Sequence, residues 1–260
     1  MRSALILCGG RATRMGSRAA HLPKALLSVH GKPILWYIVG RLYRAGIRHF
    51  IFPIGHRGQD IVEWIGKLSA PDCKFEAIDT GANTEVGRRL AMVRHLLPDN
   101  ESFMLANGDA LFDFDIERMI AEHEAGGHLA TLATSPVISQ FGLLIESGGR
   151  IMDFSRDSHI QSISTSEHGE TTTGYVYAGI AALRTDALDS EDIENALDFE
   201  IELFRGMIGR NSLRRFAIKG YWHAIDTPKD LDLINASIGW RATGARHLRA
   251  TLEGFGEAEK

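Results

Sequence analysis

Apolar residues follow two alternating patterns along the first half of the chain. Short runs rich in apolar residues, typical of buried strands, cover residues 4–8, 47–54, 74–79 and 103–106. Between them, apolar residues recur at helical spacing over residues 33–46, 59–68 and 86–97. Strands and helices in regular alternation predict an α/β fold with a doubly wound, mostly parallel sheet. Ligands of such sheets bind at the carboxyl ends of the strands, so we expect the chemistry there.

The second half of the chain is less regular. Residues 155–173 are rich in Ser, Thr and His, and they predict a long exposed loop, either a substrate lid or a segment without fixed structure. Just before it, residues 141–146 and 150–154 predict a small antiparallel hairpin around a glycine pair. The other predicted elements are a helix at 116–123, a strand at 129–133, a strand at 175–183, a helix at 199–208, a strand at 213–218 and a helix at 228–238.

The first strand breaks directly into two glycines, which are followed by basic residues. Gly9 and Gly10 allow positive φ angles and close approach, so the backbone N–H groups of this turn can surround an anion. Arg14 offers a planar fork and Lys24 a compact charge, and both suit phosphate oxygens. The stretch therefore predicts a polyphosphate-binding loop. It fits neither a dinucleotide fingerprint, which needs three glycines at set positions, nor a Walker loop, which needs Gly-Lys-Ser/Thr.

The same stretch resembles the signature of the sugar-phosphate nucleotidyltransferases. That signature is Gly-Gly-x-Gly-Thr-Arg, then Pro-Lys, then a Lys-Pro that opens a helix. The matching residues are Gly9, Gly10, Thr13, Arg14, Pro23, Lys24, Lys32 and Pro33. Ala12 departs from it, because it stands where the family has its third glycine. The resemblance implies a Rossmann-like nucleotidyltransferase fold, with Arg14 on the β- and γ-phosphates and Lys24 on the α-phosphate and the attacking group.

Two carboxylates are the candidate metal ligands. Asp109 follows the strand at 103–106 and should face the glycine turn, where a bare carboxylate would repel a triphosphate unless Mg²⁺ lay between them. The resemblance implies that Asp109 and Asp226 bind this ion, and that Arg14, Lys24 and Asp109 are catalytic. On the residues alone, Asp109 also fits a turn cap, and Asp226 also fits the start of a helix.

The resemblance extends over residues 3 to about 238 and is nearest to the glucose-1-phosphate cytidylyltransferases. Residues 31–38 and 79–90 carry it, and so do Gly108-Asp109 with the residues that follow. CTP is therefore the nucleotide that the resemblance favours over UTP, dTTP and GTP. The nucleotide-binding residues that it implies are Leu7, Cys8, Gly9, Gly10, Arg11, Ala12, Thr13, Arg14, Lys24, Gly87, Arg89, Asn107 and Gly108.

The acceptor half of the signature is rewritten. The family has Phe-x-Glu-Lys-Pro after the hairpin, whereas this chain has Phe154-Ser-Arg-Asp-Ser; the family's Asn-x-Gly appears as Tyr177-Ala-Gly179. Arg156 takes the place of the lysine as a candidate phosphate partner. The acceptor is then a sugar 1-phosphate such as glucose 1-phosphate, or a phosphorylated molecule that is not a sugar. The acceptor-binding residues that this implies are Gly142, Arg156, Tyr177 and Gly179.

These assignments divide the chain into one domain and a tail. We expect a single nucleotidyltransferase domain at 1–240, with its nucleotide-binding half at about 1–125 and its acceptor-binding half at about 126–240, and a C-terminal tail at 241–260. The eleven histidines are scattered without zinc-ligand spacing, which favours surface positions. Two alternatives stay open: a guanylyl-, uridylyl- or thymidylyltransferase of the same family, and a catalytically silent relative that senses nucleotides.

Bulk properties narrow the partners and the compartment. A net charge of −4 gives no electrostatic reason to expect nucleic acid or a membrane surface as a partner. No apolar run approaches the 18 residues of a membrane span. The two cysteines lie in or beside predicted strands, as buried thiols in a reducing compartment do, and we expect a cytoplasmic protein. A homo-oligomer is left open.

Overall fold

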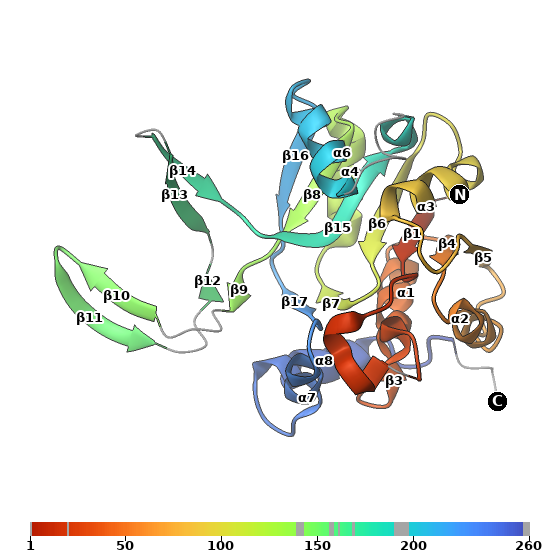
Figure 1. Ribbon diagram of the computed structural model, residues 1–260, viewed down its shortest axis with the longest axis horizontal. Coiled ribbons are helices and arrows are strands. Elements are labelled where there is room, and N and C mark those ends of the chain that lie inside the picture. Colours follow the sequence, from red (N-terminus) through yellow and green to blue (C-terminus); the bar gives the residue numbers. More distant parts are fainter. Residues whose placement is uncertain are drawn as a thin grey trace.

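The computed structural model describes residues 2–19, 21–138, 143–155, 159–160, 162–167, 170–189 and 198–256. A seven-stranded sheet in the order β16-β8-β15-β6-β1-β4-β5 forms its centre (Figure 1). Only β15 runs antiparallel to its two neighbours in this sheet, so the predicted mostly parallel α/β fold is confirmed. Its strands are β1 (Ser3–Leu7), β4 (His49–Ile54), β5 (Lys74–Asp79), β6 (Ser102–Asn107), β8 (Ala130–Thr134), β15 (Tyr177–Arg184) and β16 (Leu213–Ala217).

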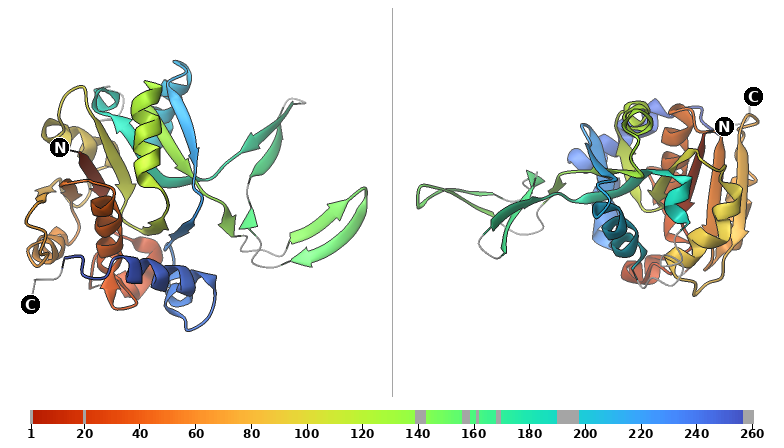
Figure 2. Two further views of the ribbon diagram at one scale, coloured as in Figure 1. Left: turned by 180° about the vertical axis from the view of Figure 1, so that it is seen from behind. Right: turned by 90° about the horizontal axis from the view of Figure 1, so that it is seen from above.

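Helices cover both faces of this sheet (Figures 1 and 2). Within β1, Ala4 and Ile6 belong to the larger apolar core, with residues of α1, α4, α7 and α8, whereas Leu5 belongs to a second core with α3 and α6. This alternation follows from the two-residue period of a strand, and it makes the sheet doubly wound. The α-helices are α1 (Ile34–Arg44), α2 (Gly58–Ile65), α3 (Val86–Val93), α4 (Ile116–Gly126), α6 (Phe199–Ile208), α7 (Pro228–Asn235) and α8 (Trp240–Thr251).

Short elements complete the body of the fold. β7 (Ala110–Asp113) and β17 (Tyr221–Ala224) form a separate antiparallel pair. In the chain, β7 follows β6 and β17 follows β16. The remaining ones are the β2–β3 pair (Ser28–Val29, Lys32–Pro33) and the 3₁₀ turns η1 (Thr13–Ala19), η2 (Lys24–Leu26), η3 (Arg94–Leu96) and η4 (Thr185–Leu188).

Two-stranded ribbons extend away from the body (Figures 1 and 2). The predicted hairpin is present as β10 (Leu143–Ser147) and β11 (Arg150–Ser155), although residues 141–142 lie outside the described residues. The exposed loop predicted at 155–173 is wrong for its described part, which contains three strands. They are β12 (His159–Ile160), paired with β9 (Val137–Ile138), and the pair β13 (Ile163–Glu167) and β14 (Glu170–Gly174). Strands pair through backbone hydrogen bonds, which polar residues such as those of β13 and β14 form without giving an apolar period, so the pattern did not reveal them.

The C-terminal segment is part of the core, not a tail. The helix α8 buries Ala245 and Leu248, and the residues after it bury Leu252 and Phe255. The indole N–H of Trp36 in α1 donates to the carbonyl of Phe255 over 3.0 Å. The many charges of 241–260 hid this packing in the sequence, because apolar residues are only a minority of the segment.

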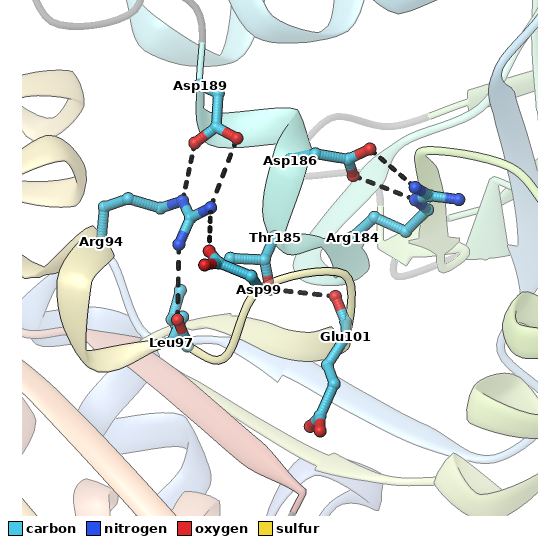
Figure 3. Close-up of polar contacts among 8 residues, drawn as sticks. All are labelled: Arg94, Leu97, Asp99, Glu101, Arg184, Thr185, Asp186 and Asp189. Carbon is cyan, nitrogen blue, oxygen red and sulfur yellow. Dashed lines mark hydrogen bonds and ion pairs between the residues drawn. The ribbon is translucent and has the colours of Figure 1, made fainter.

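A polar cluster connects the two halves of the chain beside the amino-terminal end of β6, away from the carboxyl ends of the parallel strands. Figure 3 shows Arg94 between Asp99 and Asp189, with nitrogen–oxygen distances of 2.9 and 2.7 Å. Beside it, the hydroxyl of Thr185 donates to the carbonyl of Glu101 over 2.9 Å. The cluster therefore fixes the start of β6 against the end of β15.

Among the described residues, no helix combines the length and the hydrophobicity of a membrane span.

Three of the described histidines are buried, although the sequence favoured surface positions for most histidines: His49, His123 and His223. His123 is 2% exposed, and its ring nitrogens lie 3.0 Å from the hydroxyl of Thr131 and 3.2 Å from that of Ser102. Burial, together with the nearby charges of His128 and Arg184, lowers the pKa of His123 to about 4.

This histidine makes stability depend on pH. The unfolded chain binds a proton at His123 below its ordinary pKa of about 6.5, whereas the folded chain does so only below about 4. We expect the free energy of unfolding to fall as the pH drops through this window, by up to about 3 kcal/mol from this group. Urea unfolding between pH 7.5 and 4.5 should give a shallower slope for His123→Gln than for the wild type. His247→Gln, an exposed change on α8, should keep the wild-type slope; equal slopes for all three proteins would contradict the assignment.

Candidate active site

Neighbouring parallel strands bring the glycine turn and Asp109 together. β1 and β6 are parallel neighbours with Leu7 opposite Asn107, so the segments that follow these two strands start side by side at the carboxyl ends of the strands. The N–H of Gly108 donates to the carbonyl of Leu7 over 2.9 Å. A Cβ atom on Gly108 would lie 2.7 Å from that carbonyl oxygen, so only glycine permits this approach. Asp109 therefore starts directly beside the turn that follows β1.

The antiparallel pair β7–β17 brings Asp226 to the same place. Ala224 lies opposite Ala110, and the N–H of Ile225 donates to the carbonyl of Asp109 over 2.9 Å. Directly after Asp226, Thr227 and Asp230 form a capping box at the start of α7, with Pro228 in its first turn. The cap is provided by Thr227, which leaves the carboxylate of Asp226 available to the cleft.

Lys24 lies between these two carboxylates. Its Nζ is 2.8 Å from Oδ2 of Asp109 and 2.9 Å from Oδ1 of Asp226, and its side chain is only 15% exposed. Arg14 lies further out, with Nη1 3.9 Å from Asp226 and a side chain that is 78% exposed. The structure thus brings together three predicted residues from distant parts of the chain and leaves Arg14 free to meet a ligand from solvent.

The donor set fits a hard divalent cation. Both carboxylates contact one nitrogen atom, so they are close enough to share an ion. Among the described residues, no group of three or more His, Cys, Asp or Glu side chains is assembled. An ion here would therefore complete its coordination with phosphate oxygens and water, which is the way Mg²⁺ is usually held.

Arg89 lies beneath the glycine turn and supports it. The side chain is 4% exposed; its guanidinium donates to the hydroxyl of Thr80 over 2.6 Å and to the carbonyl of Gly9 over 3.3 Å. Burial lowers the pKa of Arg89, and the negative charges of Asp79 and Glu85 oppose this shift. A Cβ on Gly9 would lie 2.6 Å from the guanidinium, so glycine is required at that position. Arg89, which was predicted as a nucleotide contact, thus supports the glycine turn through its hydrogen bond to Gly9.

Ala12 has a backbone conformation that glycine would adopt more easily. Its φ is +50°, in the left-handed region, and the N–H of Met15 donates to its carbonyl over 2.9 Å. An alanine there costs roughly 1 kcal/mol relative to the right-handed region. Alanine in place of the family's third glycine therefore strains the backbone at residue 12, because the turn keeps the conformation that suits glycine.

Three cavities lined by described residues meet at Asp109. The central cavity, about 280 Å³, lies between the glycine turn, Lys24 and both carboxylates. The α3-side cavity, about 670 Å³, lies between Arg11 and the start of α3. The α8-side cavity, about 430 Å³, runs along β17 to the start of α8. One elongated cleft therefore passes the acidic centre on both sides.

Most of the predicted site residues line this cleft. They are Leu7, Cys8, Gly9, Gly10, Arg11, Ala12, Thr13, Arg14, Lys24, Arg89, Asn107, Gly108, Asp109, Tyr177, Gly179 and Asp226. Gly87 does not, because it is buried within α3. Gly142 and Arg156 lie outside the described residues. Burial raises the pKa of the Cys8 thiol to about 12, so this residue is a wall of the cleft and not a nucleophile.

The structure adds residues that sequence patterns missed. Asn83, which accepts a hydrogen bond from Arg11 over 2.6 Å, and Glu200 line the α3-side cavity. Burial raises the pKa of Glu200. His223 and Arg241 line the α8-side cavity. Neither Arg241 nor Glu200 belongs to a motif; each enters the cleft only through the packing of its helix.

Gly179 and Tyr177 form one wall of the α8-side cavity. Gly179 has φ +70°, and a Cβ there would lie 2.6 Å from Nδ2 of Asn107, so this glycine makes room for the asparagine. The ring of Tyr177 packs edge-on against Phe204 at 5.5 Å, and burial raises its pKa. The tyrosine thus contributes a largely apolar surface where the family signature has an amide.

The comparison with known proteins identifies the chain as a nucleotidyltransferase. The chain belongs to the MobA-like NTP transferase family, whose model matches residues 4–140. The family-level resemblance seen in the glycine-turn motif is thereby confirmed.

Individual relatives cover nearly the whole chain. It is 28% identical over 252 residues to a Bacillus subtilis (strain 168) protein named "Probable glucose-1-phosphate cytidylyltransferase", covering 89% of this chain and 94% of that one. It is also 28% identical over 248 residues to the glucose-1-phosphate cytidylyltransferase of Salmonella typhi, covering 87% and 92%. The crystal structure of HddC from Yersinia pseudotuberculosis matches with a TM-score of 0.65 at 18% identity, covering 95% of this chain and 99% of that chain. This last likeness establishes the fold alone.

Proposed function

We propose that this chain is a Mg²⁺-dependent cytidylyltransferase that joins CTP to a phosphorylated small molecule and releases pyrophosphate. One observation carries the proposal: Asp109 and Asp226 meet at Lys24 beside the glycine turn, although they are far apart in the chain. Cations and carboxylates without a histidine base suit phosphoryl transfer, in which positioning and charge neutralisation provide most of the catalysis.

The residues of the cleft have distinct tasks in this reaction. An oxygen of the acceptor phosphate attacks the α-phosphorus, the bond from that phosphorus to the bridging oxygen of the β-phosphate breaks, and pyrophosphate leaves with the bonding electrons. The acceptor phosphate is largely ionised at neutral pH, so it needs no general base. Mg²⁺, when bound by Asp109 and Asp226, neutralises phosphate oxygens. Lys24 orients the α-phosphate and the attacking group, and Arg14 meets the outer phosphates.

Three features support the order of ligands along the cleft. The α3-side cavity is the larger one and contains Asn83 and Glu85, whose polar side chains suit the edge of a base. The central cavity contains Arg14 and Lys24, the two cations that suit phosphate groups. The α8-side cavity then receives the acceptor, a sugar 1-phosphate such as glucose 1-phosphate or another phosphorylated molecule. The names of the relatives favour CTP.

The compartment and the assembly are part of the proposal. Nucleoside triphosphates are cytoplasmic substrates, and we place the enzyme in the cytoplasm.

The β10–β11 ribbon exposes Leu144, Ile151, Met152 and Phe154, each more than half exposed, which favours a homo-oligomer that covers them. Light scattering on the eluted peak of a sizing column tests this; a monomer would contradict it.

Thermal shift and product assays test the function. CTP with Mg²⁺ should raise the melting temperature more than UTP, dTTP or GTP does, because a ligand of the folded state stabilises it by mass action. Pyrophosphate should then be released from CTP with at least one member of a panel of phosphorylated acceptors. A larger shift with GTP would favour a guanylyltransferase. Binding of CTP without turnover on any acceptor would favour the nucleotide sensor.

A further inference from the structure

The far end of the α8-side cavity carries a cation that the reaction does not use. Arg241, in the first turn of α8, lines this cavity and is the one cation among its described lining residues. Its guanidinium carbon lies 5.9 Å from the centre of the Trp240 ring, its Nε is buried without a hydrogen-bond partner, and no ion pair links Arg241 to a carboxylate of the described residues. A half-buried guanidinium in this state offers a planar fork to an anion.

His223 adds a second unpartnered group at the same end. It is 8% exposed, it lines the cavity, and its Nε2 has no hydrogen-bond partner among the described residues. Burial and the charge of Arg241 lower its pKa to about 4, so it is neutral near pH 7 and retains one N–H to donate. The ring packs edge-on against Trp240 at 6.0 Å, which fixes its place beside α8.

The helix α8 itself points its positive end at this region. Its N-cap is Gly239, no side chain caps its first turn, and that turn contains no acidic residue. The first N–H groups of a 12-residue helix favour an anion. Two independent side chains and a helix terminus therefore converge on one end of the cavity.

One carboxylate that lines the cavity, Asp230, is already engaged in the cap of α7. Oδ2 of Asp230 accepts hydrogen bonds from the backbone N–H groups of Asp226 and Thr227 and from the hydroxyl of Thr227. Asp230 is thus committed to capping α7. Asp109 and Asp226 are bound to Lys24 at the other end of the cavity.

We propose that the acceptor carries a second anionic group, a carboxylate or a phosphate ester, which binds Arg241, His223 and the start of α8. This inference rests on the function proposed above and specifies its acceptor. His223 precedes Asp226 by three residues, so the Cα atoms of these two residues, which mark the two ends of the cavity, are at most about 11 Å apart. A single hexose-sized molecule can reach both. An acceptor that is uncharged at this end would remove water from Arg241 without pairing its charge, which weakens binding.

Calorimetric titration without nucleotide tests the second anionic group directly. The probes are glucose 1-phosphate, glucose 1,6-bisphosphate and glucuronic acid 1-phosphate, which share a ring and a reacting phosphate. We expect the wild type to bind at least one of the two doubly anionic probes about tenfold or more tightly than glucose 1-phosphate. Which of the two binds more tightly identifies the group as a phosphate ester or a carboxylate.

Matched variants connect this preference to its residues. Arg241→Gln should abolish the preference, and Arg241→Lys should keep part of it. Arg249→Gln removes an exposed charge from the same helix and should leave it unchanged. Circular dichroism confirms that each variant is folded. Equal affinity of the wild type for all three probes, or a preference that survives in folded Arg241→Gln, would overturn the inference.

Turnover separates this inference from the proposed function. With CTP and Mg²⁺, the preferred doubly anionic probe should release pyrophosphate with a lower KM than glucose 1-phosphate, and Arg241→Gln should raise that KM. Rapid turnover of glucose 1-phosphate without any preference would keep the transferase and reject the second anionic group. The binding preference without turnover on any probe, or on any member of the panel of phosphorylated acceptors, would keep the anion site and reject the transferase.

Discussion

Replacing Lys24 by methionine is expected to lower kcat for pyrophosphate release by about 10²- to 10³-fold or more. Methionine fills the space of the lysine stem but removes the charge that lies 2.8 and 2.9 Å from the two carboxylates. In the reaction that charge stabilises the α-phosphate as negative charge shifts toward the leaving group. Initial rates at saturating CTP, Mg²⁺ and acceptor measure the effect.

The matched control for this variant is Lys67→Met. Lys67 is exposed and distant in sequence from the turn, so its loss should leave kcat within about twofold, as for most surface changes. A second readout follows from the geometry: without Lys24, Asp109 and Asp226 lose the cation between them, and only the exposed Arg14 stays near Asp226, at 3.9 Å. The melting temperature of Lys24→Met should therefore fall without Mg²⁺ and recover more than the wild type when Mg²⁺ is added. Wild-type turnover by the variant would exclude Lys24 from the chemistry.

Replacing Asp226 by asparagine is the second change with a large expected effect. Asparagine preserves the shape of the side chain and an oxygen that can accept from Lys24, but it removes the negative charge that a divalent ion needs. We expect kcat to fall by about 10²-fold or more and the Mg²⁺-dependent part of the CTP thermal shift to disappear. Asp109→Asn should behave in the same way.

This variant also decides between the two interpretations that the sequence left open for Asp226. If the residue served mainly to start α7, Asp226→Asn would lower the melting temperature and leave the metal dependence unchanged. Asp232→Asn is the control, because Asp232 is an exposed carboxylate of α7 paired with Arg18 at 2.8 Å. It should retain wild-type turnover and metal dependence.

Local patterns in the sequence predicted most of the central sheet and its helices. β5 begins and ends where the apolar pattern predicted it, and so does α6. These segments alternate or repeat at the period of a strand or a helix, and that period follows from which face each element buries. The ribbons were harder: β13 and β14 carry polar, threonine-rich residues whose partners give no apolar period. The helix α8 was also missed, because its buried face is narrow and its other positions are charged or polar.

Distance along the chain limited the prediction of the site. The glycine turn, Lys24 and Asp109 could be proposed because each stands in a short motif. The meeting of Asp109 with Asp226 was implied only by the family resemblance, because it depends on the pairing of β7 with β17, which no local pattern specifies. Arg241 has no motif at all, and it reaches the cleft because α8 packs its apolar side on the same core as α1.

By itself, the sequence determined the class of fold, the phosphate-binding turn and the charged residues that the chemistry needs, because these properties depend on neighbouring residues. Only the tertiary structure decided that Lys24 lies between the two carboxylates, that Arg89 supports the glycine turn, and that Arg241 lines the α8-side cavity. The physical reason is that these contacts join segments separated by many residues. Their formation depends on how the whole core packs and not on the preference of any one segment.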